Sequence, residues 1–213
     1  MQASQEPKPR WERRKDARPQ ELLAAALHHF VERGYAATRL EDVAKQAGVS
    51  KGTLYLYFAN KEELFKEVVR VNIVATIGQA EQDVAAFDGP SGELLAALLM
   101  KWWNEICATS LGGIAKLMLA EGNNFPELAQ FYNDEVVARG SSLITRVLER
   151  GVARGEFRPV DPMVMTQVLI APVMMLMMWT HSYMPTCDMT IAPDAFMETF
   201  ITTTLRGLSA DGA

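Results

Sequence analysis

The chain has 213 residues, 49% of them hydrophobic, which allows one or two domains with a sizeable buried core. Its two cysteines, Cys107 and Cys187, show no CxxC spacing, which argues against a disulfide framework or a zinc site and suggests a reducing, cytoplasmic setting. The N-terminus is polar and basic without an apolar run, so no signal peptide is expected.

The formal net charge of −5 is unevenly distributed along the chain. Residues 1–70 contain 13 Lys and Arg against 10 Asp and Glu, whereas residues 71–213 contain 8 against 16. A basic N-terminal region on an acidic remainder favours one orientation toward a polyanion. The overall negative charge therefore does not exclude nucleic-acid binding.

Residues 1–18 combine Pro, Gln and charged residues with no apolar period, so a disordered basic tail is expected. Two roles for this tail remain open. It could be an arm that lies on phosphates or in a minor groove, or a solvated tail without a partner.

A first helix is predicted over residues 19–33, because Pro19 is favourable at the first helical position and apolar residues recur at helical spacing. Gly34 is expected to end it. His28 and His29 are adjacent in this helix and diverge by about 100°, so a metal role is not expected.

Residues 38–61 contain two short predicted helices that are joined by a tight turn. The spacing of Thr38 and Glu41 is typical of a capping box, which would start a helix that ends near residue 47. Gly48 suits the left-handed position after a helix C-terminus. This arrangement of helix, glycine-containing turn and helix predicts a helix-turn-helix motif.

The second helix of the motif is predicted to begin after Ser50 as N-cap and to run for about two turns. Leu54 and Phe58 lie four residues apart and should face inward. Lys51 lies in the first turn, where a cation opposes the helix dipole, so a phosphate partner would explain it better than helix stability does. Asn60 is expected to cap a third, longer helix.

Residues 19–66 resemble the DNA-binding domain of the TetR/AcrR family of bacterial transcriptional regulators. The residues that carry this resemblance are Ala25, Ala26, Phe30, Gly34, Tyr35, Thr38, Val43, Ala44, Ala47, Gly48, Val49, Ser50, Thr53, Leu54, Tyr55, Tyr57, Phe58, Lys61, Glu62, Glu63 and Leu64. The resemblance implies a three-helix head with the start of a fourth helix, followed by a helical body. It also implies dimerisation through the last two helices, here about residues 162–184 and 194–208.

Helix projection together with this resemblance predicts which side chains contact double-stranded DNA. Gly52, Thr53 and Leu56 should point outward, with Tyr55 and Tyr57 beside them. The predicted contact set is Thr38, Arg39, Lys51, Gly52, Thr53, Tyr55, Leu56, Tyr57 and Lys61.

The remaining chain, residues 67–213, is predicted to form a helical effector-binding and dimerisation domain. Its expected helices span residues 60–87, 92–110, 113–122, 124–154, 161–184 and 193–208. No segment is typical of a strand, so the fold class is all-α with about nine helices.

Residues 162–187 carry no charge and are long enough to span a bilayer. Polar residues interrupt this run, and its flanks are Asp161 and Asp188 rather than basic anchors. A buried helix is therefore the favoured interpretation, with one face on its own domain and the other on a second subunit. No membrane association is expected.

Nine of the 12 methionines fall between Met163 and Met197. Methionine is flexible and polarisable, so the cluster indicates either an adaptable ligand cavity or ordinary core and dimer packing. The candidate ligand-binding residues are Trp102, Trp103, Met118, Phe131, Tyr132, Met174, Met175, Met178 and Trp179.

The predicted function is a cytoplasmic, homodimeric DNA-binding regulator, a repressor that a small, mostly apolar effector releases from a palindromic operator. No cofactor and no metal are expected. One alternative is a DNA-binding regulator without any effector. An enzyme is the other alternative, but His181, Ser182 and Asp188 lack an oxyanion-hole motif, and no Gly-rich phosphate loop or nucleophile elbow is present.

Overall fold

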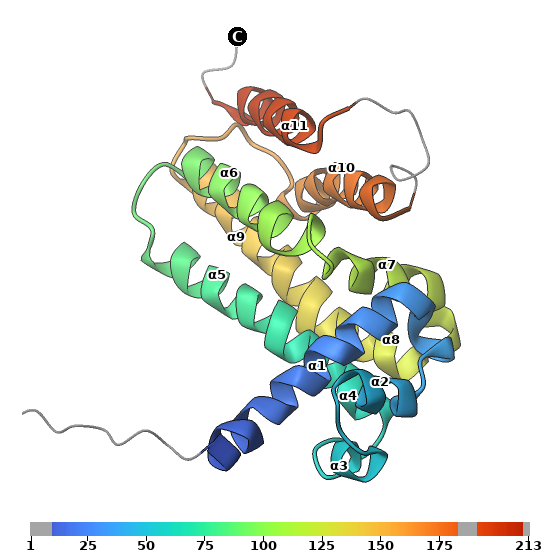
Figure 1. Cartoon of the computed structure of the whole chain (residues 1–213). Helices are drawn as coiled ribbons and strands as arrows, with labels where there is room; N and C mark the ends of the chain where they lie inside the picture. Colours follow the sequence, from blue (N-terminus) through green and yellow to red (C-terminus); the bar gives the residue numbers. More distant parts are fainter. Residues whose placement is uncertain (1–9, 183–190, 211–213) are drawn as a thin grey trace, which may run out of the picture. The chain divides into compact units, whose positions relative to one another are not determined.

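The computed structural model describes residues 10–182 and 191–210 (Figure 1). The chain divides into two compact units, an N-terminal unit that ends at Val68 and a C-terminal unit that begins at Val69. Within the described ranges every regular element is a helix, and the one exception is an isolated antiparallel bridge between Phe157 and Ser209. The prediction of an all-α fold is confirmed.

Four helices form the N-terminal unit, and three aromatic rings lie in its core. The helices are α1 (Arg10–Ala37), α2 (Leu40–Gln46), α3 (Lys51–Tyr55) and α4 (Lys61–Val69). The ring of Phe65 lies edge-on, 5.2 Å from Phe30 and 5.5 Å from Tyr35. Such edge-to-face contacts add to the hydrophobic burial of the rings. They join α4 to the end of α1 and so fix the frame that holds the helix-turn-helix motif.

Helix α1 begins earlier than the sequence predicts. Its backbone is helical from Arg10, so Pro19 lies inside the helix, and the expected disorder of residues 1–18 does not extend through residues 10–18. Residues 1–9 of the expected tail lie outside the described ranges. Gly34 has φ 79° and ψ 169°, so it interrupts the helix where the sequence places its end.

The predicted boundaries inside the helix-turn-helix motif are confirmed. Gly48 follows α2 with φ 67°, the left-handed conformation that glycine adopts without a side-chain penalty. The Ser50 hydroxyl accepts the backbone N–H of Thr53 at 3.1 Å. The Asn60 side chain accepts the backbone N–H of Glu63 at 2.8 Å at the start of α4.

The predicted capping box at the start of α2 is wrong. The N-cap residue is Arg39, and no side chain caps this helix. The Thr38 hydroxyl instead lies 2.7 Å from the carbonyl oxygen of Gly34 and 3.0 Å from that of His29. It therefore satisfies carbonyl groups at the end of α1, which otherwise lack a partner inside the helix.

Helical residues run without a gap from Lys61 to Ala86, as the sequence predicts to within one residue. The stretch consists of α4, a π-helical turn η1 (Arg70–Val74) and α5 (Ala75–Ala86). The boundary between the two units falls inside this stretch, at Val68–Val69. One helical segment of the chain is therefore shared between the units.

In the C-terminal unit, α9 packs against α5, α6 and α10, while α11 packs against α6 and α10 (Figure 1). The elements are α6 (Ser91–Trp102), η2 (Trp103–Cys107), α7 (Gly112–Glu121), η3 (Gly122–Asn124), α8 (Pro126–Tyr132), η4 (Asn133–Val137), α9 (Ala138–Ala153), α10 (Pro162–Ser182) and α11 (Pro193–Leu208). When segments joined by π-turns are counted once, the described ranges hold nine helical stretches.

Helix α10 buries one face and exposes another. Leu169, Val173 and Leu176 are fully buried, whereas Met163 is 73% exposed and Val168 is 53% exposed. Within the described residues, α10 is the one helix whose length and apolar composition would suffice to cross a membrane. An exposed apolar face of this size on a helix that also packs on its own unit calls for a covering partner.

Candidate functional site

The first candidate site is the outward face of α3 and the turn that follows it. Leu56 is 83% exposed, Tyr55 44% and Tyr57 36%, whereas Leu54 and Phe58 are buried. The inward and outward faces therefore lie as helix projection predicts. A large exposed leucine between two exposed tyrosines has no role in the core of this unit, and it is accessible to a partner.

Lys51 lies on this face and pairs with Glu41 of α2. Its ammonium also lies 5.7 Å from the centre of the Tyr55 ring, within the range of a cation–π contact. The hydrogen bond from Lys51 is the main reason that the pKa of Glu41 is lowered, and the same bond raises the pKa of Lys51. Both side chains are exposed, so an incoming phosphate can compete for this ammonium.

The other outward residues lie around the start of the two motif helices. Gly52 is exposed, and the Thr53 hydroxyl lies 2.9 Å from that of Ser50. Arg39 is exposed at the N-terminus of α2. Lys51, Gly52 and Thr53 therefore lie in the first turn of α3, whereas Arg39 lies at the start of α2.

Thr38 and Lys61 lie differently from the rest of the predicted contact set. Thr38 is 2% exposed, and its hydroxyl bonds to backbone carbonyls. The Lys61 ammonium donates to the carbonyl oxygens of Tyr35 at 2.7 Å, Thr38 at 3.1 Å and Ala36 at 3.2 Å. Both side chains hold the end of α1 in place. The sequence pattern did not predict this structural role.

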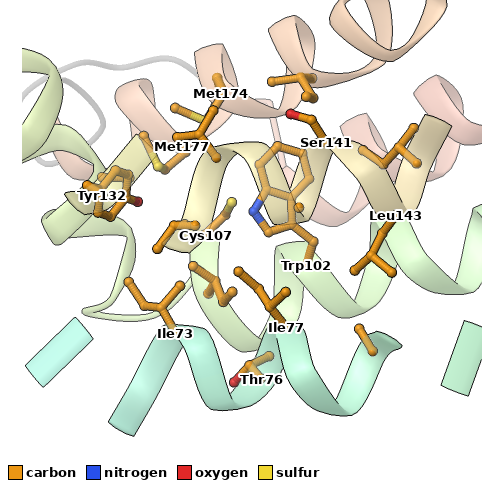
Figure 2. A pocket seen from close by; sticks show the side chains of 18 of the residues that line it. Ile73, Thr76, Ile77, Trp102, Cys107, Tyr132, Ser141, Leu143, Met174 and Met177 are labelled. Carbon is orange, nitrogen blue, oxygen red and sulfur yellow. The ribbon is translucent and has the colours of Figure 1, made fainter. Parts of the chain in front are cut away.

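The second candidate site is a cavity of about 480 Å³ inside the C-terminal unit (Figure 2). Residues from nine consecutive or neighbouring elements line it, namely η1, α5, α6, η2, α7, α8, η4, α9 and α10. Apolar side chains form most of this wall. A cavity of this size and character lies in the range of small-molecule sites in proteins.

The structure brings four of the nine predicted ligand-binding residues to this cavity, namely Trp102, Met118, Tyr132 and Met174. The other five do not line it. Trp103 is 1% exposed in the core, Met175 is 52% exposed on the outer face of α10, and the ring of Phe131 lies 5.1 Å from the guanidinium of Arg70. Met178 and Trp179 also lie outside the lining. A role in ligand binding stays a prediction for all nine.

Sequence reasoning missed most of the wall because ordinary aliphatic residues supply it. Ile73, Ile77, Leu143 and Ile170 line the cavity and follow the same helical spacing as core residues. Thr76, Cys107 and Ser141 add small polar groups, beside the polar groups of Lys101, Trp102, Tyr132 and Asn133. The available signal was a small polar residue on an otherwise apolar helix face, as at Thr76 between Ile73 and Ile77.

Each of the three π-helical turns in the described residues contributes to the cavity wall. Ile73 comes from η1, Ile106 and Cys107 from η2, and Val136 and Val137 from η4. A π-turn carries one extra residue in a helix, widens it locally and is frequent at functional sites. These turns move side chains out of the regular helical register at the cavity.

The cavity interior disfavours negative charge. Burial raises the pKa of the Cys107 thiol from its ordinary 9.0 to about 12. Burial is also the main cause that raises the pKa of the Tyr132 hydroxyl. Lys101 is the single charged residue among those lining the cavity, and its ammonium lies 2.5 Å from a carboxylate oxygen of Asp83. The described residues contain no group of three or more His, Cys, Asp or Glu side chains that could hold a metal ion.

The two units match two family models. Residues 22–68 match the model described as bacterial regulatory proteins of the tetR family. Residues 84–192 match the model described as a tetracyclin repressor-like C-terminal domain. The first match covers the helix-turn-helix motif, and the second covers the part of the cavity wall that lies beyond residue 84, which leaves out Ile73, Thr76, Ile77 and Ala80.

Curated relatives extend these matches over both units. The fatty acid metabolism regulator protein of Bacillus subtilis is 29% identical over 147 residues, which cover 68% of this chain and 74% of the relative. The transcriptional repressor KstR2 of Mycolicibacterium smegmatis is 32% identical over 146 residues, which cover 67% and 69%.

Solved structures share the fold. FadR of Bacillus subtilis in complex with stearoyl-CoA has a TM-score of 0.74 at 24% identity and covers 89% of this chain and 98% of that chain. The ketosteroid regulator KstR2 of Mycobacterium tuberculosis has a TM-score of 0.66 at 22% identity and covers 90% and 95%. At these identities the likeness shows a common fold.

Proposed function

The chain belongs to the TetR family of bacterial regulatory proteins and is a DNA-binding regulator, and from this premise we propose that it is a homodimeric repressor. A small, mostly apolar ligand that fills the cavity releases it from a palindromic operator. The apolar cavity of about 480 Å³ is the observation that carries the ligand-responsive part of the proposal. Like its family, the protein acts on DNA in the cytoplasm.

The DNA-binding face consists of Arg39, Lys51, Gly52, Thr53, Tyr55, Leu56 and Tyr57. Arg39 and Lys51 supply positive charge for phosphates, and the methyl groups of Thr53 and Leu56 face the bases. The internal hydrogen bonds of Thr38 and Lys61 support an indirect role, in which both residues hold the turn that presents this face.

The exposed side of α10 supports the dimer. Met163, Val164, Val168 and Met175 are 52–73% exposed along this helix and form an apolar surface. In water such a surface gains free energy when a second copy covers it. A two-fold dimer of this kind presents two α3 helices and therefore recognises a palindrome.

A hydrocarbon-rich ligand fits the cavity best, because its wall offers extensive apolar surface and few polar atoms. The relative from Bacillus subtilis is a fatty acid metabolism regulator, which makes long-chain lipids the first probes to test. Methionine side chains at Met118, Met174 and Met177 let the wall adapt to chains of different shape.

The helical stretch of residues 61–86 is the proposed link between ligand and DNA. Its N-terminal end is capped by Asn60, directly after the DNA-binding face, while Ile73 and Ile77 line the cavity. A ligand shifts the equilibrium between a DNA-binding and a DNA-released conformation only if its affinity for the two conformations differs. A ligand that displaces Ile73 and Ile77 would tilt this stretch and move the two α3 helices away from the spacing of about 34–36 Å that successive major grooves require.

A two-step measurement tests this function. Long-chain lipids are first screened for a rise in the melting temperature, because a ligand that binds the folded state stabilises it. Operator affinity is then measured with and without a stabilising lipid. With a coupling free energy of about 1–3 kcal/mol, a saturating ligand weakens operator binding roughly 5- to 150-fold. A lipid that stabilises the protein and leaves operator affinity unchanged contradicts the release mechanism and favours a regulator without an effector.

A further inference from the structure

Two polar groups in the apolar cavity have no hydrogen-bond partner within the described protein. They are the indole N–H of Trp102 and the hydroxyl of Tyr132, and neither side chain forms a hydrogen bond to another described group. Figure 2 shows the Trp102 nitrogen turned toward the part of the cavity where Cys107 lies, and the Tyr132 hydroxyl turned inward from another wall. Such groups cost free energy in an apolar space unless something bonds to them.

The chemistry of these groups restricts what the ligand must offer. An indole N–H can only donate, and a tyrosine hydroxyl can donate as well as accept. The thiol of Cys107 stands in the same wall and is a weak donor. All three groups can therefore be satisfied by an acceptor atom on the ligand, and a plain hydrocarbon offers none.

The charges around the cavity restrict the ligand further. Lys101, the single charged residue of the lining, is paired with Asp83 and lies at a part-exposed position. A carboxylate placed beside Trp102 and Tyr132 would have no free cation to pair with, and burying an unpaired charge is strongly unfavourable. The acceptor must therefore be uncharged.

We infer that the cavity selects a hydrocarbon-rich molecule with an uncharged carbonyl oxygen, which accepts a hydrogen bond from Trp102 or Tyr132. This inference rests on the proposed ligand-binding function and specifies its ligand class. Esters, thioesters and ketones share this chemistry. Free fatty acids, which are anions at neutral pH, and unsubstituted hydrocarbons lack it.

Four probes of matched chain length test the inference on the full-length protein. They are methyl laurate, methyl undecyl ketone, laurate and dodecane, and their dissociation constants are measured at neutral pH by calorimetry. The ester and the ketone are expected to bind most tightly. Tyr132→Phe, which removes only the hydroxyl oxygen, and Trp102→Phe, which removes the N–H, should each weaken ester and ketone binding roughly 3- to 10-fold.

Dodecane provides the internal reference, because it makes no hydrogen bond. Its affinity should be unchanged or increased in Tyr132→Phe, since the cavity becomes less polar. Ile77→Val is the matched control in the same wall. It removes one methyl group and should weaken the ester and dodecane by the same factor.

The possible outcomes distinguish an error about the carbonyl contact from an error about the ligand site itself. If Tyr132→Phe and Trp102→Phe change ester and dodecane binding equally, the carbonyl contact is refuted while an apolar ligand site remains. Laurate that binds more tightly than methyl laurate, and loses this advantage in Lys101→Met, refutes the neutral-ligand inference in favour of a carboxylate at Lys101. If none of the probes binds, the ligand site itself is refuted.

Discussion

Lys61 was predicted to contact DNA, but its hydrogen bonds in the structure indicate that it holds the end of α1 in place. Its ammonium bonds to the carbonyl oxygens of Tyr35, Ala36 and Thr38, where the chain leaves α1. Hydrogen bonds from a charged donor are among the stronger ones in proteins. We predict that Lys61→Met lowers the free energy of unfolding by about 1–3 kcal/mol in urea denaturation. Lys45→Met, at an exposed position of α2, is the control and should change it little.

The Glu41 carboxylate is expected to compete with DNA phosphates for the Lys51 ammonium. Glu41→Gln removes the carboxylate that pairs with this ammonium, so Lys51 becomes free to bind phosphate. We predict tighter binding to random DNA and a steeper dependence of log affinity on log salt concentration, by about one phosphate contact. Lys51→Met should do the opposite. Equal salt slopes in wild type, Glu41→Gln and Lys51→Met would show that Lys51 does not reach the DNA backbone.

Cys107 should make stability fall at alkaline pH. Burial raises its pKa from 9.0 to about 12 in the folded protein, so above pH 9 the unfolded chain loses the thiol proton while the folded chain retains it. The free energy of unfolding therefore decreases as pH rises through this window, by about 1 kcal/mol between pH 9 and pH 10. Cys107→Ala should lack this contribution in denaturation curves at pH 8, 9 and 10. An identical alkaline loss in wild type and Cys107→Ala would contradict the burial of this thiol.

Individual residues also show the limits of the sequence as a guide. Ser50, Asn60 and Gly48 were predictable because local hydrogen bonding and backbone conformation determine their roles. Thr38 was not, because its hydroxyl bonds to carbonyls of a helix that ends before it rather than to the helix that follows. Competition between two neighbouring helix ends is decided by tertiary structure.

Among the elements, α3 is the proposed recognition helix, and the middle of its outward face offers no Arg or Asn side chain for a bidentate base contact. Its outward residues are Gly52, Thr53 and the 83% exposed Leu56, which lies at its end. Apolar contacts of this kind recognise the methyl group of thymine. We predict that replacing thymine with uracil lowers affinity at one or more half-site positions in a binding assay. If no position responds, these side chains do not face the bases.

The helices were more predictable than the cavity between them. Apolar periodicity and the Gly and Pro positions placed the boundaries of the helical stretch 61–86 and of α10 and α11 within a few residues. The cavity depends on which of several aliphatic stripes leave a void, and on the π-turns that displace residues such as Ile73 and Val136. The local sequence signal for these properties is weak, a small polar residue such as Thr76 on an apolar helix face, so the prediction from Met and Trp content found only part of the wall.

For the whole molecule, the exposed side of α10 predicts a dimer that a single charge disrupts. Val168 is 53% exposed in the middle of this apolar surface. Val168→Arg should place a cation against the partner subunit, and we predict a monomer in sedimentation and operator affinity at least 10-fold weaker, since one half-site is lost. Gln82→Arg, at an exposed position of α5 outside this surface, is the control. A Val168→Arg protein that stays dimeric would place the interface elsewhere.

Recognition of a palindromic operator through the α3 face can be tested by selecting DNA from a random pool with the whole chain. We expect enrichment of a two-fold symmetric sequence, with binding reduced by substitutions on the α3 face such as Tyr57→Ala and Leu56→Ala. The same selection in the presence of a stabilising lipid should enrich that sequence less. If no sequence is enriched above the random pool, the chain does not recognise DNA through this face, and the account is contradicted.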